Sequence, residues 1–224
     1  MTLKPGAALL FDIDGTLADT DALHLAAFNT VFAPFGQSFD RGSYTRDIQG
    51  FANIDISARF LPSETAERRV EAMNAKEAAF RAAAGAGLEP MPGLLALLDL
   101  CEHHGIPKAA VTNAPRANAE MILSGLGIAH RFNALIIGEE LAHGKPHPLP
   151  YLEGLRAIGA VADCTLAFED SCSGVRSATA AGVATIGITS SLSAADLMDA
   201  GAVAGVATYD DPAVMHWLRT RLVI

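Results

Sequence analysis

The sequence lacks any apolar run long enough to cross a membrane. Asp, Arg, Gly or Pro interrupts each stretch before it reaches the roughly 20 residues that a membrane helix needs. The first 15 residues also lack the longer apolar segment and the small-residue cleavage site of a signal peptide. We therefore expect a cytoplasmic protein with no membrane partner.

Basic residues and cysteines are also scarce. The chain has 16 Lys and Arg against 25 Asp and Glu, which gives a formal net charge of −9 and a pI near 5.1. Because a nucleic-acid backbone is bound by concentrated Lys and Arg, this balance argues against a nucleic-acid partner. The 3 cysteines share no metal-like spacing and are expected to be free thiols in a reducing compartment.

Aromatic residues make up only 6% of the chain, whereas 50% of it is apolar. This content excludes disorder and supports a core built from Ala, Leu, Val and Ile. Short apolar runs that alternate with helical patterns predict strands at 7–11, 108–112, 134–138, 165–168 and 183–188, with a weaker one at 202–206. Such runs suit strands buried on both faces, so we predict an α/β fold with a doubly wound, Rossmann-like parallel sheet.

About ninety residues separate the first two predicted strands, far more than a single crossover helix needs. This stretch has helical patterns at 21–35, from Asp40, a plausible N-cap, to Gly50, and from Ser63 to about Ala84. We predict a core domain formed by residues 1–16 and 90–224, and an inserted helical domain at 17–89.

Polar residues follow the carboxyl ends of the first four predicted strands, where open α/β sheets bind ligands. Carboxylates can hold a hard cation, and an ammonium with a hydroxyl can hold an anion, so the set suits magnesium-assisted phosphoryl transfer. In strand order the residues are Asp12 and Asp14, then Thr112 and Asn113, then Lys145, then Glu169 and Asp170.

In order and spacing, these segments resemble the four motifs of the haloacid dehalogenase (HAD) superfamily, and the insert falls where that family has its helical cap. The resemblance covers nearly the whole chain. It points to the β-phosphoglucomutase-like and sugar-phosphatase branch, since Asp19, Thr20 and His24 also follow that branch's pattern. The resemblance implies a phosphoric monoester hydrolase that acts on a small phosphorylated metabolite, a sugar or polyol phosphate. We expect a monomer or weak homodimer.

The resemblance also implies a role for each motif residue. Asp12 is the implied nucleophile and Asp14 the implied acid and base. Thr112 would bond a phosphoryl oxygen, while Lys145 would offset charge on the nucleophile and the phosphate. Mg²⁺ is the implied cofactor, with Asp12, the backbone carbonyl of Asp14, Glu169 and Asp170 as its ligands.

Substrate binding is expected from Asn113 beside the second motif and from several residues of the insert. His24 is selected by its spacing after the first motif, and Lys76 by a Lys-x-x-x-aromatic pattern that it forms with Phe80. The insert residues expected to select the substrate are His24, Gln49, Asn53 and Lys76.

Gln49 and Asn53 also bear on the reaction. The β-phosphoglucomutase-like branch has Lys and Arg at these positions, where they hold a second phosphate, whereas both residues here are neutral. We therefore predict a monophosphatase with water as the acceptor. A phosphosugar mutase is the alternative and would need Lys76 and Arg46 to replace those cations. A non-catalytic protein that binds a phosphate ligand on the same fold is the alternative from another class.

Overall fold

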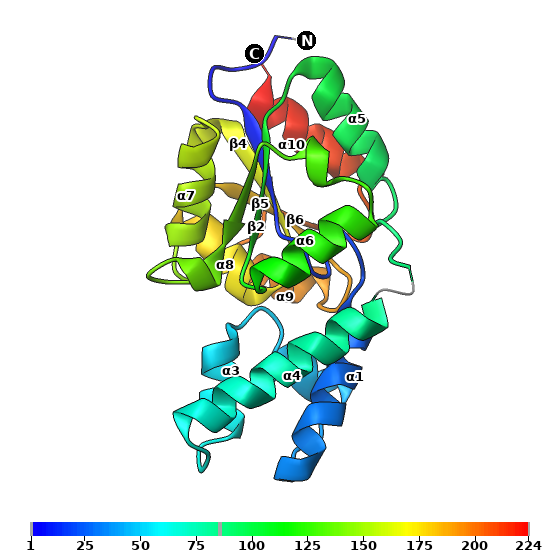
Figure 1. The fold of residues 1–224 in the computed structure, drawn as a ribbon. Coiled ribbons are helices and arrows are strands. Elements are labelled where there is room, and N and C mark those ends of the chain that lie inside the picture. The colour runs from blue at the N-terminus through cyan, green and yellow to red at the C-terminus, as the bar shows by residue number, and fades with distance from the viewer. Residues whose placement is uncertain (1, 85–86, 224) are drawn as a thin grey trace.

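A six-stranded parallel sheet is the centre of the computed structural model, which describes residues 2–84 and 87–223 (Figure 1). The strand order is β3-β2-β1-β4-β5-β6, so the order reverses on either side of β1. This order confirms the predicted fold class. Each predicted strand begins and ends within two residues of the limits of the observed strand. The strands are β1 (Ala8–Phe11), β2 (Lys108–Thr112), β3 (Ala134–Ile137), β4 (Thr165–Glu169), β5 (Ala184–Ile188) and β6 (Ala204–Val206).

Helices cover both faces of the sheet, which explains why the strands are continuously apolar. Leu9 and Phe11 of β1 point into the larger apolar cluster, whereas Leu10 points into a second cluster on the opposite face. The larger cluster includes α5 (Leu94–His104), α6 (Arg116–Gly125) and α10 (Pro212–Leu222). The second includes α7 (Leu149–Ala157) and α8 (Cys172–Ala180), and α9 (Ala194–Asp199) packs beside β6.

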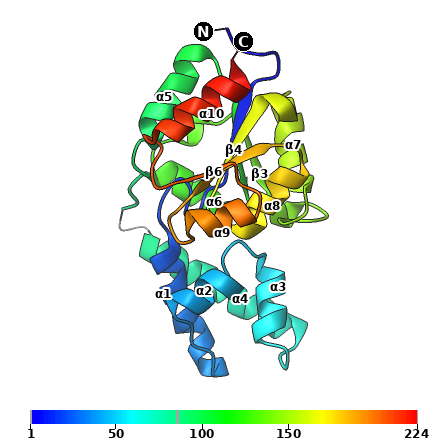
Figure 2. The same cartoon turned by 180° about the vertical axis from the view of Figure 1, so that it is seen from behind.

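The helical insert lies beyond the carboxyl ends of the strands, as the view from behind also shows (Figure 2). It has its own apolar cluster, in which Phe28 and Phe32 pack edge-on with ring centroids 5.4 Å apart. Its helices are α1 (Asp21–Phe32) with the 3₁₀ turn η1 (Ala33–Phe35), α2 (Arg41–Asp47), α3 (Asn53–Phe60) and α4 (Ala66–Ala84).

Local signals explain where these helices begin. Asp40 caps α2 as expected, because its carboxylate accepts from the backbone N–H of Ser43 while the Ser43 hydroxyl accepts in return. The predicted start of the long helix at Ser63 is wrong: α4 begins at Ala66, after Thr65, whose hydroxyl accepts from the N–H of Arg68. Helix α3 was not predicted.

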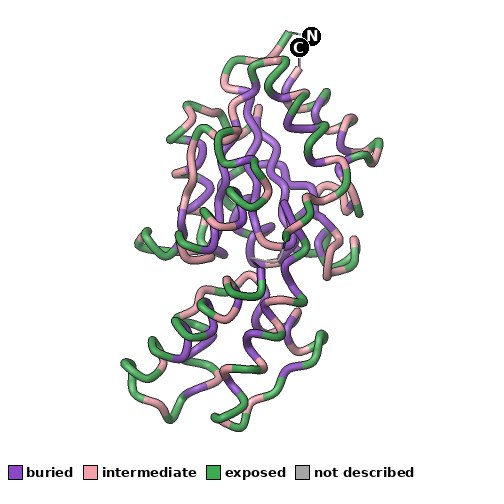
Figure 3. Tube along the Cα trace, turned by 45° about the vertical axis from the view of Figure 1, so that its right-hand side comes forward, coloured by how far each residue is buried: buried purple, intermediate pink, exposed green. Residues whose placement is uncertain are grey.

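The central strands β1, β2, β4 and β5 are buried, the edge strands β3 and β6 are partly buried, and the outer helix faces are exposed (Figure 3). The predicted domain limits at 16/17 and 89/90 remain a proposal, and the predicted ranges include residues 1, 85, 86 and 224, which lie outside the described residues. Cys101, Cys164 and Cys172 are unpaired. Within residues 2–84 and 87–223, every helix is too short or too polar to span a membrane.

Candidate active site

The carboxyl ends of the strands and the helical insert enclose a cavity of about 80 Å³. It brings together residues from every motif region of the sequence. Of the predicted site residues, Glu169 alone does not line the cavity, because it is fully buried beside it. Those that line it are Asp12, Asp14, His24, Gln49, Asn53, Lys76, Thr112, Asn113, Lys145 and Asp170.

Two glycines, Gly15 and Gly174, leave the space that the carboxyl groups of Asp170 and Glu169 occupy. At Gly15, φ is +70° and a Cβ atom would lie 2.0 Å from the Asp170 carboxylate, so only glycine lets the chain turn there. At Gly174, on α8, a Cβ atom would lie 1.9 Å from the Glu169 carboxyl group. Both acids therefore occupy space that a side chain on the neighbouring backbone would fill.

Lys145 holds two of the carboxylates. Its Nζ donates to Oδ1 of Asp12 and Oε1 of Glu169, both at 2.6 Å, and to the carbonyl of Val111 at 2.7 Å. Burial alone would lower the pKa of Lys145, but the two carboxylates outweigh it and raise that pKa. The ammonium therefore stays charged and uses its three donors within the protein.

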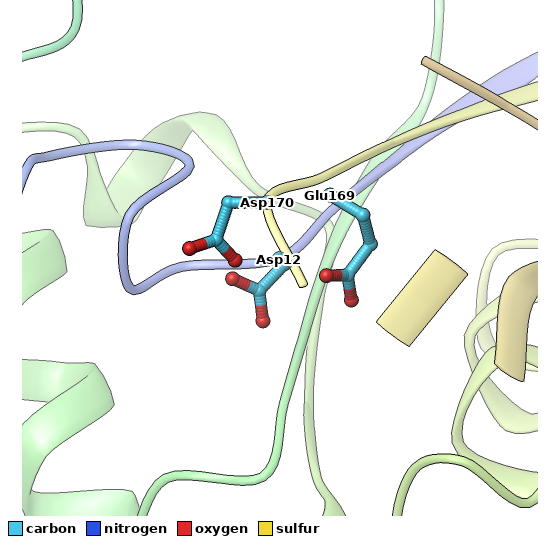
Figure 4. A group of neighbouring side chains, drawn as sticks. All are labelled: Asp12, Glu169 and Asp170. Carbon is cyan, nitrogen blue, oxygen red and sulfur yellow. The ribbon is translucent and has the colours of Figure 1, made fainter. Parts of the chain in front are cut away.

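Asp12, Glu169 and Asp170 form a buried acidic cluster in which one oxygen of each lies within 4.8 Å of the others (Figure 4). Burial raises the pKa of Asp12 to about 7, with Lys145 opposing the rise and Glu169 adding to it. Burial and the charge of Asp12 raise the pKa of Asp170 well above its usual range. The raised pKa values show that the cluster has too little positive charge nearby. Because its polar atoms are carboxylate oxygens, it can hold a hard metal cation.

Asp14 is held at the cavity by residues that follow the first motif. Its Oδ1 accepts from the Thr20 hydroxyl at 2.9 Å and lies 3.0 Å from Nε2 of His24. Nζ of Lys76 lies 2.9 Å from Nδ1 of His24. Because an ammonium can only donate, Nδ1 accepts and Nε2 carries the proton that His24 donates to Asp14.

Charge and stacking define the environment of this chain of contacts. Burial would raise the pKa of Asp14, but the contacts with His24 and Thr20 lower it overall. Burial and the ammonium of Lys76 lower the pKa of His24, which favours the neutral ring. The ring of His24 also stacks on Phe80, with centroids 3.7 Å apart. His24 therefore has one fixed orientation, with its donor toward Asp14.

The other predicted substrate-binding residues lie at the cavity with part of their polar groups already used. Asn113 accepts from the N–H of Lys145 at 2.9 Å and donates to the carbonyls of Lys145 and Gly50. Gln49 donates to Oδ2 of Asp170 at 2.6 Å, and Asn53 donates to Oε1 of Glu77 at 2.8 Å. Asn113 thus fixes the backbone around Lys145, and its predicted contact with substrate stays a prediction.

Sequence reasoning missed several residues of the site. Tyr151, on α7, donates to Oε1 of Glu169 at 2.7 Å, and no motif marks it. Asp21 lines the cavity, and burial raises its pKa to about 6. Its place directly after Asp19 and Thr20 was the available signal. Glu77 also lines the cavity, and its adjacency to Lys76 could have drawn attention to it.

Comparison with known proteins places this geometry in context. The family model of the haloacid dehalogenase-like hydrolases matches residues 9–188. Protein CbbY, plasmid, of Cupriavidus necator is 35% identical over 222 residues, covering 92% of this chain and 87% of that protein. The fructose-1-phosphate phosphatase YqaB of Escherichia coli is 29% identical, covering 79% of this chain and 93% of its own.

A solved structure agrees with these relatives. The crystal structure of a CbbY mutant from Rhodobacter sphaeroides in complex with xylulose 1,5-bisphosphate superposes with a TM-score of 0.80 at 28% identity. The superposition covers 91% of this chain and 95% of that one.

Proposed function

The chain belongs to the haloacid dehalogenase-like hydrolases, and we propose that it is a magnesium-dependent phosphatase of a small phosphate monoester, a sugar or polyol phosphate. One observation carries the proposal: a single cavity holds Asp12 bonded to Lys145 and Asp14 bonded to His24. Ester cleavage through a covalent intermediate needs a nucleophile and a separate acid at the same substrate, and these two carboxylates can supply them. The phosphatase relative named above supports the reaction type.

In the proposed first step, a carboxylate oxygen of Asp12 attacks phosphorus, and the bond from phosphorus to the leaving oxygen breaks. The product is an aspartyl-phosphate. Asp14 gives a proton to the leaving alkoxide, and in the second step its carboxylate takes a proton from the water that cleaves the aspartyl-phosphate. The lowered pKa of Asp14 suits the second step, and the negative charge of a bound ester raises that pKa for the first.

Thr112 would contact the phosphate in both steps, and Lys145 would offset charge on the nucleophile and the phosphate. The hydroxyl oxygen of Thr112 accepts from the N–H of Ala114 at 2.9 Å, so its own proton is available to a phosphoryl oxygen. Lys145 offsets charge on the nucleophile through its bond to Asp12. Both residues are almost completely buried, which strengthens their interactions with an anion.

Mg²⁺ would be held by Asp12, Glu169, Asp170 and the backbone carbonyl of Asp14. The raised pKa values of Asp12 and Asp170 support this assignment, since they mark a deficit of positive charge among oxygen ligands. When bound, the ion offsets the repulsion between a carboxylate and a phosphate dianion.

The charges around the cavity favour a monophosphate over a second, distal phosphate. Among the described lining residues, the Lys side chains are Lys76 and Lys145, and both are already bonded to acids. Arg46, which a mutase would need, does not line this cavity and pairs with Asp47 at 2.7 Å. We therefore propose that water is the phosphoryl acceptor. We also propose that the protein works as a monomer or weak homodimer.

The test is phosphate release from a panel of sugar, polyol and nucleotide monophosphates, with and without Mg²⁺. The panel includes β-glucose 1-phosphate, assayed also for glucose 6-phosphate, and xylulose 1,5-bisphosphate is assayed beside the panel. We expect Mg²⁺-dependent release from at least one sugar or polyol monophosphate, and loss of about 10⁴-fold or more in a folded Asp12→Asn variant. Formation of glucose 6-phosphate without phosphate release would instead identify a mutase. Equal rates in the Asp12→Asn variant would refute the covalent mechanism.

A further inference from the structure

Buried polar side chains connect the insert to the core beside the cavity. Asn118 on α6 is 0% exposed, and its amide contacts two residues of α4. Its Nδ2 donates to Oε2 of Glu77 at 2.6 Å, and Nη1 of Arg81 donates to its Oδ1 at 2.7 Å. Helices α6 and α4 pack against each other, and Figure 1 shows α6 lying along α4 at the junction of core and insert.

An amide suits this position for a chemical reason. Glu77 and Arg81 stand four residues apart, so they lie on one face of α4 with opposite charges. Glu77 needs a donor and Arg81 needs an acceptor, and Asn118 supplies both from one planar group. Neither a carboxylate nor an apolar side chain of the same size can make both bonds.

Glu77 continues the connection toward the reacting groups. Its Oε1 accepts from Nζ of Lys76 at 3.0 Å, and Lys76 contacts His24, which donates to Asp14. Glu77, Lys76 and His24 are 5%, 3% and 7% exposed. Because such buried, bonded side chains have few alternative positions, the place of α4 relative to the core decides where His24 holds Asp14.

We propose that Asn118 is a positioning residue for Asp14: by joining Glu77 and Arg81 to the core, it fixes α4 where Lys76 and His24 orient the acid. Asn118 is not among the residues that line the cavity, so it acts through the others. The inference rests on the proposed phosphatase function, in which Asp14 protonates the leaving group.

Leaving-group dependence separates positioning from a general structural role. An ester with a basic alkoxide leaving group needs the general acid, whereas 4-nitrophenyl phosphate releases a stable phenolate and needs it much less. The two probes are 4-nitrophenyl phosphate and the most reactive alkyl monophosphate of the panel above, each assayed with Mg²⁺. We expect Asn118→Leu to lower kcat/KM, which reports the step that releases the leaving group, about tenfold more for the alkyl ester than for the aryl ester.

Matched variants complete the test. Arg81→Met removes one of the two bonds from a half-buried side chain, and we expect a smaller selective loss in the same direction. If Asn118→Leu does not fold, Arg81→Met alone provides the test. Asn133→Ala is the control. It removes the hydrogen bond that the Asn133 side chain accepts from the backbone N–H of Lys108 within the core, and it should affect both esters equally. Equal losses on both esters in folded Asn118→Leu and Arg81→Met, or no loss, would overturn the positioning role. Failure of the unmodified chain on both esters would refute the phosphatase function itself.

Discussion

The acidic cluster predicts an unusual pH dependence for the metal-free protein. The pKa of Asp12 is raised from 3.8 to about 7, chiefly by burial, so between these values the folded state holds a proton that the unfolded chain has released. Stability must then fall as pH rises from about 4 to about 7, and change little above that through this group. This is the opposite of the usual behaviour of a carboxylate paired with a cation.

The magnitude follows from the size of the shift. A rise of about 3 pKa units corresponds to about 4 kcal/mol of unfolding free energy lost across the window, at roughly 1.4 kcal/mol per unit. The raised pKa values of Asp21 and Asp170 act in the same direction, whereas the lowered pKa of His24 acts in the opposite direction. Asp12→Asn should remove the Asp12 part and reduce the Asp170 part, while its amide oxygen can still accept from Lys145.

The assay is urea unfolding at pH 5, 6, 7 and 8, for the unmodified chain and Asp12→Asn, in EDTA and in Mg²⁺. In EDTA we expect Asp12→Asn to be the more stable protein at pH 8, with the difference shrinking toward pH 5. Mg²⁺ should flatten the slope of the unmodified chain more than that of the variant, because the ion stabilises the ionised cluster. Parallel slopes for the two proteins in EDTA would refute the reasoning.

Two further substitutions test how the cluster is supported. Tyr151→Phe removes the buried bond to Glu169 and should cost about 1.5–3 kcal/mol in urea unfolding of the metal-free protein; a cost near zero would mean that the bond is not formed in solution. Gly174→Ala would force the Glu169 carboxyl group to move, and we expect Mg²⁺ affinity, measured from the activity titration, to fall roughly 10–100-fold. Gly125→Ala is its control, because a Cβ there meets nothing within 4 Å, and equal effects of the two substitutions would contradict the assignment.

The sheet and the core of the site could be predicted because both depend on local sequence. Strands buried on both faces read as continuous apolar runs, so β1, β2 and β4 were located directly. Parallel strands place their carboxyl ends at one edge, which brings Asp12 and Lys145 together although 133 positions separate them. No such rule applies to α3, whose 8 residues follow a loop and lack a side-chain N-cap bond.

Side-chain contacts between residues far apart in the sequence could not be predicted, because they depend on tertiary placement. The sequence marks Asn113 as a residue at a strand end. Only the structure shows that its side-chain amide is hydrogen-bonded to both the backbone N–H and the backbone carbonyl of Lys145. Likewise, Glu77 and Asn118 stand 41 positions apart, and no motif links the two. Their pairing follows from how α4 packs on α6, which single-sequence patterns do not encode.

Burial serves the proposed reaction in a way that exposure could not. Near neutral pH, a carboxyl group with a pKa of about 7 is protonated in a large fraction of molecules and is then a poor nucleophile. Lys145 alone does not correct this, because its charge is shared between Asp12 and Glu169. Near neutral pH, further positive charge in the cluster would therefore complete the ionisation of Asp12. The same burial that would destabilise the metal-free protein would thus make the nucleophile respond to a bound cation.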